Sequence, residues 1–297
     1  MKATPICIFV YKRADTFQQV VESLKTNPEC SSSPLYIFSD SARSSHDSIA
    51  IDEVRKYAGS ISGFASVEVI ERSSNMGLAK SIISGVTQVL EEYERVIVLE
   101  DDLLVSNNFL AYMHQCLDVY ESTEDVWSVS GYSGQRIADL NGDPDIYFGR
   151  RSSSWGWATW RRTWSKVDWS VADYPVLKDK QVQRDFKRGG GDLITMLERQ
   201  QRGLIDSWAI RFSFYQFLNK AFDVVPKHSK VVNLGFAETA TNTVGMEKRF
   251  STTLDKSGKR IFDLPLDPKE DAQFMKAFRA PFSMPVRLKY KLLTMFK

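Results

Sequence analysis

The sequence has few cysteines, little net charge and no long apolar stretch. Cys7, Cys30 and Cys116 are an odd number without the spacing of metal ligands, so we expect free thiols in a reducing compartment rather than a disulfide framework. No apolar run approaches the length of a membrane span, and residues 1–5 are too interrupted for a signal peptide. These absences predict a cytoplasmic protein.

Charge is nearly balanced except in the C-terminal tail. Thirty-nine basic and 37 acidic residues leave a formal charge of +2, so we expect no nucleic-acid partner. Residues 276–297, however, carry six basic side chains and no acidic one. A helix there would place Leu288, Leu292, Met295 and Phe296 on one face. The pattern fits peripheral contact with an anionic membrane, and it equally fits a solvated helix docked on its own domain.

Short apolar segments alternate with amphipathic helical patterns through the first 130 residues. We expect strands at residues 6–11, 35–38, 67–70, 96–99 and 126–130, with helices between them, two of which would be capped by Asp15 and Ser106. This alternation predicts an α/β fold with a mostly parallel central sheet and helices on both faces. We divide the chain into an α/β half (1–130), a second half of the same domain (131–238), and a polar loop with a basic tail (239–297).

The strand expected at residues 96–99 ends abruptly in Glu100, Asp101 and Asp102. A strand buried on both faces cannot hold unpaired carboxylates, so these acids must emerge at its carboxyl end, which borders the ligand crevice in open α/β sheets. Clustered carboxylates suit Mg²⁺ or Mn²⁺ and, through it, a phosphorylated ligand. An acidic turn that caps the following helix explains the same residues about as well.

The turn after the first strand lacks the glycines of a phosphate-binding loop. It contains Tyr11, Lys12, Arg13 and Ala14, and neither G-x-G-x-x-G nor a P-loop follows. This absence disfavours dinucleotide oxidoreductases, P-loop kinases and sugar-nucleotide nucleotidylyltransferases.

Tryptophan is concentrated in one stretch of the second half. Five of the seven tryptophans lie within residues 155–169. They form either a packed aromatic sub-core or a rim over the crevice, where indole rings stack on sugars. For the second case we expect Trp155, Trp157 and Trp208 to contact an acceptor.

Several of these motifs, taken in order, resemble GT-A fold glycosyltransferases over about residues 5–235. The order is the Lys12-Arg13 turn, Ser39-Asp40, Asn75-Met76-Gly77-Leu78 and Leu99-Glu100-Asp101-Asp102. The Glu-Asp-Asp form is similar to the N-acetylglucosaminyltransferase I-like group, near the broad family 2 transferases.

The resemblance implies a nucleotide-sugar donor, with UDP as the expected carrier. It implies that Asp102 ligates Mn²⁺ or Mg²⁺ and that Glu100 and Asp101 contact the ribose or the donor sugar. The donor-binding residues that it implies are Arg13, Asp40, Asn75 and Lys80, although Lys80 fits a plain surface lysine as well.

The resemblance also implies an inverting enzyme with an aspartate as general base. Asp206, which precedes Ser207-Trp208, is the first candidate, although it also fits a simple helix N-cap. Asp168 and Glu238 are reserves. His228 is a further candidate site residue, for which a structural role is the alternative. Residues 239–260 are polar and are expected to form a mobile loop.

These inferences predict a metal-dependent hexosyl- or N-acetylhexosaminyltransferase of cell-surface polysaccharide biosynthesis. Its acceptor would be a saccharide or a lipid-linked oligosaccharide at the inner face of the plasma membrane. The alternatives are a catalytically silent GT-A-like glycan-binding module and a nucleotidylyltransferase.

Overall fold

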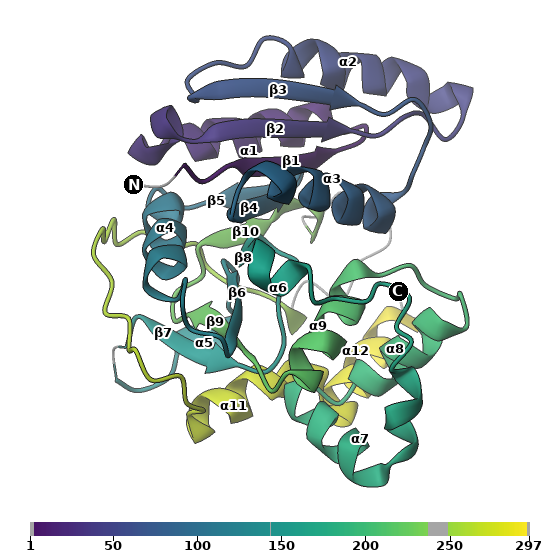
Figure 1. Ribbon diagram of the computed structural model, residues 1–297, viewed down its shortest axis with the longest axis vertical. Coiled ribbons are helices and arrows are strands. Elements are labelled where there is room, and N and C mark those ends of the chain that lie inside the picture. The colour runs from purple at the N-terminus through teal and green to yellow at the C-terminus, as the bar shows by residue number, and fades with distance from the viewer. Residues whose placement is uncertain (1–2, 143, 237–248, 296–297) are drawn as a thin grey trace.

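An eight-stranded sheet forms the centre of the molecule (Figure 1). The computed structural model describes residues 3–142, 144–236 and 249–295, with side chains up to residue 290. The strand order is β3-β2-β1-β4-β8-β6-β9-β7. Six of these eight strands point the same way, and β8 and β7 run antiparallel to their neighbours. The strands are β1 (Ile6–Val10), β2 (Pro34–Ser39), β3 (Ser66–Glu71), β4 (Arg95–Glu100), β6 (Val126–Ser130), β7 (Ile146–Gly149), β8 (Trp157–Trp160) and β9 (Phe222–Pro226).

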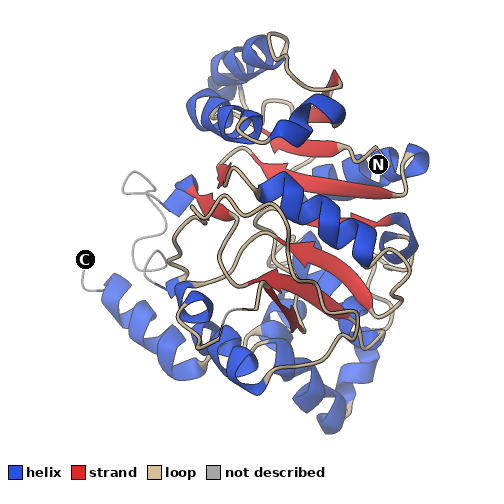
Figure 2. Cartoon of the chain, turned by 90° about the vertical axis from the view of Figure 1, so that its left-hand side faces the viewer, coloured by secondary structure: helices blue, strands red, loops and turns tan. Residues whose placement is uncertain are grey.

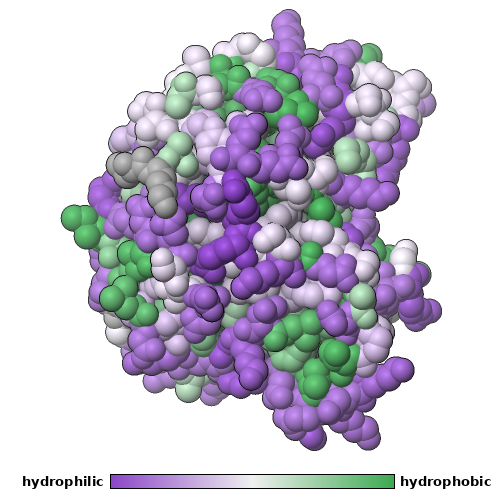
Figure 3. All heavy atoms as spheres, in the orientation of Figure 1, coloured by the Kyte–Doolittle hydropathy of each residue, from purple (hydrophilic) through white to green (hydrophobic). Residues whose placement is uncertain are grey.

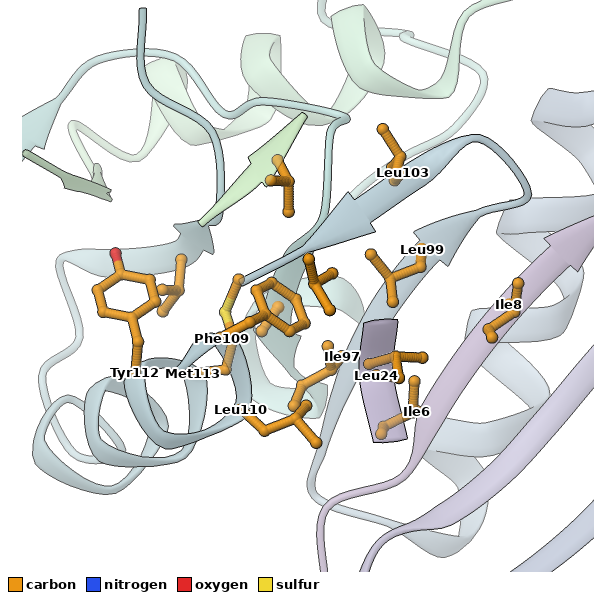
Figure 4. Close-up of a cluster of buried hydrophobic side chains, with 14 of the residues drawn as sticks. Ile6, Ile8, Leu24, Ile97, Leu99, Leu103, Phe109, Leu110, Tyr112 and Met113 are labelled. Atoms are coloured by element: carbon orange, nitrogen blue, oxygen red, sulfur yellow. The ribbon is translucent and has the colours of Figure 1, made fainter. Parts of the chain in front are cut away.

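Alternation of apolar side chains along buried strands builds a core on each face of the sheet. In β1, Ile6 and Ile8 face one core, whereas Cys7 and Phe9 face the other. The first core is closed by α1 (Ala14–Lys25), α2 (Ser48–Ala58) and α4 (Phe109–Val119). Figure 4 shows Leu24 of α1 and Phe109, Leu110 and Met113 of α4 against the sheet residues. The result is a three-layer α/β arrangement (Figure 2).

The second core is closed by helices from both halves of the sequence. They are α3 (Leu78–Glu92), α6 (Arg161–Trp164), α7 (Lys180–Phe186), α8 (Leu193–Gln201) and α9 (Trp208–Leu218). The sheet is continuous across residue 130, because β6 pairs with β8 and β9. The prediction of a mostly parallel sheet with helices on both faces is confirmed.

Two predicted helix caps are wrong. The amide of Phe17 bonds to the carbonyl of Arg13 at 3.0 Å, so α1 begins before Asp15, which lies inside its first turn. Ser106 does not cap α4, because its hydroxyl donates to Oδ1 of Asn108 at 2.7 Å and Asn108 is the N-cap residue.

Short elements complete the chain around this sheet. A second, two-stranded sheet pairs β5 (Leu103–Val105) with β10 (Val231–Asn233). The remaining α-helices are α5 (Gln135–Ala138), α11 (Ala272–Arg279) and α12 (Met284–Met295). The 3₁₀ turns are η1 (Pro28–Ser32), η2 (Ser45–Asp47), η3 (Tyr174–Lys178), η4 (Lys187–Gly189), η5 (Leu234–Phe236) and η6 (Ala280–Phe282).

The predicted mobile loop over 239–260 is wrong for residues 249–260, while residues 239–248 and Glu238 lie outside the described part of the chain. Asp255 forms a buried ion pair with Lys230, and the ammonium of Lys230 lies 4.8 Å from the centre of the Phe262 ring. Arg260 pairs with Glu29 of η1. These contacts hold the segment against η1 and against Lys230, which directly precedes β10, because a buried charge is retained only with its partner.

The surface in Figure 3 is mostly hydrophilic, with hydrophobic side chains in separate patches. Within the described residues, no helix combines the length and the apolar character needed to cross a membrane. Met284 and Leu288 of α12 are 79% and 56% exposed. The side chains of Leu292, Met295 and Phe296, expected on the same face, lie outside the described residues.

Candidate functional site: an acidic strand end beside an aromatic cavity

The acidic motif lies where the chain order of the sheet reverses. The chain moves outward from β1 to β2 and β3, then returns to place β4 on the other side of β1. Loops leaving β1 and β4 therefore part in opposite directions, and such a point opens a crevice at the carboxyl ends of the strands. The turn with Tyr11 and Arg13 follows β1, and Asp101 and Asp102 follow β4.

Arg13 brings the two aspartates together. Its guanidinium pairs with Oδ1 of Asp101 and, at 3.0 Å, with Oδ2 of Asp102. The backbone amide of Tyr11 donates to Oδ2 of Asp101 at 3.2 Å. The structure thus confirms that the acidic motif emerges at the end of the strand. The two aspartates there are already paired with the positive charge of the Arg13 side chain.

Asp102 keeps one oxygen without a partner. Among the described residues, its buried Oδ1 accepts no hydrogen bond. Gly235, in η5, covers the other oxygen so closely that an added Cβ would lie 2.6 Å from Oδ2. The amide of Leu234 donates to the carbonyl oxygen of Asp102 at 2.7 Å. Sequence reasoning missed Gly235, because no local pattern indicates that η5 folds over a motif more than a hundred residues away.

Burial disfavours the ionised forms of Glu100 and Asp101. Burial first, and then the neighbouring Asp102 and Asp101, raise the pKa of Glu100 to about 8, while Arg13 opposes the shift. Burial likewise raises the pKa of Asp101, against the lowering effect of Arg13. The site therefore favours an additional proton or an additional cation.

A divalent cation fits this donor set in part. The described residues contain no group of three or more histidine, cysteine, aspartate or glutamate side chains able to hold a metal. The partnerless Oδ1 of Asp102 is nevertheless a hard oxygen of the type that Mg²⁺ and Mn²⁺ prefer. A metal bound there would take most of its ligands from water or from a phosphorylated ligand.

Asp40 supports the neighbouring turn. Its carboxylate accepts the amides of Met76 and Gly77, each at 2.9 Å. Asn75 donates to the carbonyl of Ser41 at 2.8 Å. Both predicted donor-binding residues thus join the end of β2 to the start of α3. Lys80 is exposed in the first turn of α3.

A cavity of about 320 Å³ lies beside the acidic edge. Its walls include the aromatic side chains of Tyr132, Trp155 and Phe250. Gly156, the residue after Trp155, packs against Leu99, the residue before Glu100, because an added Cβ would lie 3.2 Å from Cδ2 of Leu99. Ser130 also lines the cavity, and its hydroxyl bonds at 2.6 Å to the buried Asp223. Trp155 of the cavity wall and Glu100 of the acidic strand end therefore flank a contact between two adjacent segments.

Two of the three predicted acceptor-binding tryptophans are core residues instead. Trp157 and Trp208 are 1% and 3% exposed, and their rings stack 4.4 Å apart. Trp164 stacks on Trp157 at 5.7 Å and lies 6.4 Å from Trp208, so the three rings form one cluster. The prediction of direct acceptor contact is wrong for Trp157 and Trp208, because β8 turns Trp157 into the second core. Trp155 alone lines the cavity.

Asp206 lies at the cavity's edge rather than in its wall. It is exposed, and its carboxylate pairs with Arg211 at 2.7 Å. The neighbouring Ser207 lines the cavity and caps α9 by accepting the amide of Ile210. The simple N-cap interpretation of Asp206 is therefore wrong.

The reserve base Asp168 and the candidate His228 are not among the residues that line the cavity. Hydrogen bonds from the hydroxyl of Ser170 and from the amides of Ala172 and Ser170 lower the pKa of Asp168 to about 2, so it is a turn-forming residue. His228 is exposed between β9 and β10. Asn233, at the end of β10, accepts the amide of Gly235, the residue that covers Asp102.

Comparison with solved structures finds proteins that are distantly similar to this chain. No family model and no curated protein matches the chain. Mannosyltransferase PcManGT from Pyrobaculum calidifontis, in complex with GDP-Man and Mn²⁺, is 13% identical over 56% of this chain and 46% of its own, with a TM-score of 0.41. TarS from S. aureus is 12% identical over 85% of this chain and 40% of its own, with a TM-score of 0.42.

A third similar structure is glucosyl-3-phosphoglycerate synthase from Mycobacterium tuberculosis, in complex with Mn²⁺, uridine diphosphate and glucosyl-3-phosphoglycerate. It is 12% identical over 56% of this chain and 59% of its own, with a TM-score of 0.37. The chain spans less than two thirds of the length of each of these three proteins. Similarity this low does not indicate a function, so the function has to be inferred from the geometry of the site.

Proposed function

We propose that this chain is a GT-A fold glycosyltransferase that moves a hexosyl or N-acetylhexosaminyl group from a UDP-linked donor to a glycan or lipid-linked oligosaccharide. The observation that carries the proposal is the cluster of Arg13, Asp101 and Asp102 at the reversal point of the sheet, next to an aromatic cavity. Such a site offers charge for a diphosphate on one side and a sugar-sized, aromatic-lined space on the other.

On the donor side, Asp102 would hold Mn²⁺ or Mg²⁺ through Oδ1. When bound, the ion would neutralise charge that develops on the leaving diphosphate. Arg13, already at the strand ends, is in reach of the same phosphates. Glu100 and Asp101 would accept hydrogen bonds from ribose or sugar hydroxyls. Asp40 and Asn75 would shape the base-binding edge through the turn that they hold, with Lys80 as an outlying positive charge.

On the acceptor side, the cavity would orient a sugar against Trp155. An inverting transfer requires a base to remove the proton of the acceptor hydroxyl. We assign this role to Asp206, because Ser207 lines the cavity and Arg211 holds the carboxylate at the start of α9. Replacing Asp206 with Asn should then abolish transfer and preserve donor binding.

One observation favours the glycan-binding alternative. Arg13 pairs with one oxygen of each aspartate and so offsets part of their negative charge. A domain that never binds a donor could keep this arrangement as a structural ion pair, with the cavity as its only binding site.

A thermal-shift titration distinguishes the two proposals. Wild type, Asp102→Ala and the control Asp52→Ala, an exposed residue of α2, would be titrated with UDP, GDP, CMP and ADP, each with and without Mn²⁺. A ligand at about 100-fold over its Kd adds roughly 2.7 kcal/mol to the stability of the folded state. We expect a Mn²⁺-dependent shift with UDP, retained in Asp52→Ala and lost in Asp102→Ala. No shift with any nucleotide would favour the binding module.

We further propose that α12 holds the enzyme at the inner face of the plasma membrane, where a cell-surface polysaccharide would be assembled. The exposed Met284 and Leu288 lie beside the basic residues of this helix. A truncation after Ser283 preserves α11, whose Phe274 and Met275 are buried. Full-length protein should sediment with anionic vesicles and the truncated form should not; equal sedimentation of the two would remove this role.

A further inference from the structure

The cavity beside the acidic edge has a strongly biased charge. Three of its described lining residues, Arg136, Arg151 and Arg249, are arginines, and none is acidic. One carboxylate lies close behind them: Asp192 pairs with Arg151 at 2.8 Å. The neighbourhood therefore has an excess of positive charge inside a partly desolvated space, where charges interact more strongly than at an open surface.

Arg151 and Arg249 are gathered at one wall. Their guanidinium carbons lie 4.1 Å and 5.9 Å from the centre of the same ring, that of Phe282. Arg249 is fixed by a hydrogen bond of 2.6 Å from its Nε to the carbonyl of Pro281. Within the described residues, its two terminal nitrogens have no hydrogen-bond partner. Among the residues that the structure describes, the open end of this fork thus has no direct ion-pair partner.

The electrostatic surroundings of Arg249 favour binding of an anion. Burial lowers the pKa of Arg249, Asp192 opposes this, and the nearby positive charges of Arg287 and Arg151 lower it further. Arg287 comes from α12, so three separate segments of the chain bring arginines to this place. Buried cations are ordinarily paired, and a planar guanidinium fork fits phosphate and carboxylate oxygens.

We propose that this cavity binds an acceptor saccharide that carries an oxyanion, a phosphate or a carboxylate, with the charged group against Arg249 and Arg151. The inference rests on the proposed transferase function, because it names the class of its acceptor. Tyr132 and Trp155 form the aromatic wall for the sugar ring, and the serine hydroxyls of the cavity supply hydrogen bonds. A neutral glycan would desolvate Arg249 without supplying an anionic partner, which disfavours binding of a neutral glycan.

Calorimetric titration with small probes tests the proposal. Glucose 6-phosphate and glucuronate would be compared with glucose and with inorganic phosphate, using the full chain. We expect both charged sugars to bind at least tenfold more tightly than glucose and than phosphate alone, with an affinity that falls as salt is added. Equal affinity for charged and neutral sugars would overturn the proposal.

Matched variants locate the binding. Arg249→Gln should weaken charged-sugar binding at least tenfold, whereas the control Arg202→Gln, exposed beyond α8, should leave it unchanged. Arg136→Gln, at the exposed rim, provides a second variant that does not disturb the bond to Pro281, and it should weaken binding severalfold. Wild-type affinity in both cavity variants would contradict the assignment.

Two further measurements are needed. The first distinguishes a saccharide from a lipid headgroup as the source of the oxyanion, and the second distinguishes the ligand class of the cavity from the proposed transferase function. Binding of phosphatidylglycerol vesicles that depends on Arg249, without binding of soluble charged sugars, would overturn the saccharide in favour of a lipid headgroup. The UDP and Mn²⁺ shift should persist in Arg249→Gln. If wild type shows charged-sugar binding but no nucleotide shift, the transferase function fails while the ligand class of the cavity stands.

Discussion

At the scale of single residues, Asp40 and Asp102 show how two carboxylates at one sheet edge differ. Asp40 accepts backbone amides at both of its oxygens. Asp102 has a buried oxygen that, within the described chain, accepts nothing. Because a buried unpaired acceptor costs about 1–3 kcal/mol, Asp102 retains the capacity to gain from a cation or a donor, whereas Asp40 is already satisfied.

Asp40→Ala should lower the free energy of unfolding by about 1–3 kcal/mol, because the amides of Met76 and Gly77 lose their acceptor. Urea unfolding would measure this, with Asp52→Ala as the exposed control. The Asp40→Asn variant, which retains one acceptor oxygen, should lose less stability. Unchanged stability together with a lost nucleotide shift would mean that the carboxylate acts on a ligand rather than on the turn.

The raised pKa of Asp223 predicts that the stability of the protein depends on pH. Burial raises the pKa of this carboxyl from 3.8 to about 8, although the hydroxyls of Ser128 and Ser130 oppose the shift. Between those values the unfolded chain has lost the proton that the folded protein keeps. The contribution of Asp223 is therefore complete below about pH 3.8, declines as pH rises and is lost above about pH 8.

Asp223→Asn should remove this decline. Relative to wild type, its free energy of unfolding should improve by up to about 1.4 kcal/mol per pH unit across that window. Urea unfolding at a series of pH values checks this. Parallel curves for the two proteins would show that Asp223 does not titrate as described.

At the scale of elements, β8, α6 and α9 are joined by stacked tryptophans. Trp157, Trp208 and Trp164 are mutual neighbours, and the ring centroid of Trp157 lies 4.4 Å from that of Trp208 and 5.7 Å from that of Trp164. This contact packs the start of α9, and thus Ser207 at the cavity, against the strand next to the acidic one. The tryptophan-rich stretch therefore supports the site mainly through its core.

Trp157→Ala should cost about 3–5 kcal/mol, the usual range for removing a large buried aromatic side chain. Trp155→Ala, at a half-buried position, should cost less and should instead weaken ligand binding in the cavity. Urea unfolding and calorimetry of the two variants would show the contrast. Equal destabilisation with equal binding would contradict their separate placement.

At the scale of the whole molecule, one sheet joins the two halves that the sequence suggests. Strands β4 and β6 of the first half both pair with β8 of the second. Since neither half has a closed core of its own at this seam, we expect the sheet to unfold as one cooperative unit.

Urea unfolding followed by tryptophan fluorescence and by far-UV circular dichroism tests this. Six of the seven tryptophans lie in the second half and the seventh is Trp127, so fluorescence reports mainly on the second half while dichroism reports on the whole chain. The two transitions should coincide. A separate early fluorescence transition would instead show two independently stable units.

The sequence alone determined β1, β2, β3, β4 and β6, because short apolar runs flanked by helical patterns allow little else. It also placed the acids at the end of β4, since a buried strand cannot hold unpaired carboxylates. Only the tertiary structure decided which tryptophans are core, that Gly235 covers Asp102, and that arginines from three distant segments meet at one cavity. These are contacts between residues far apart in the chain, and local periodicity carries no information about them.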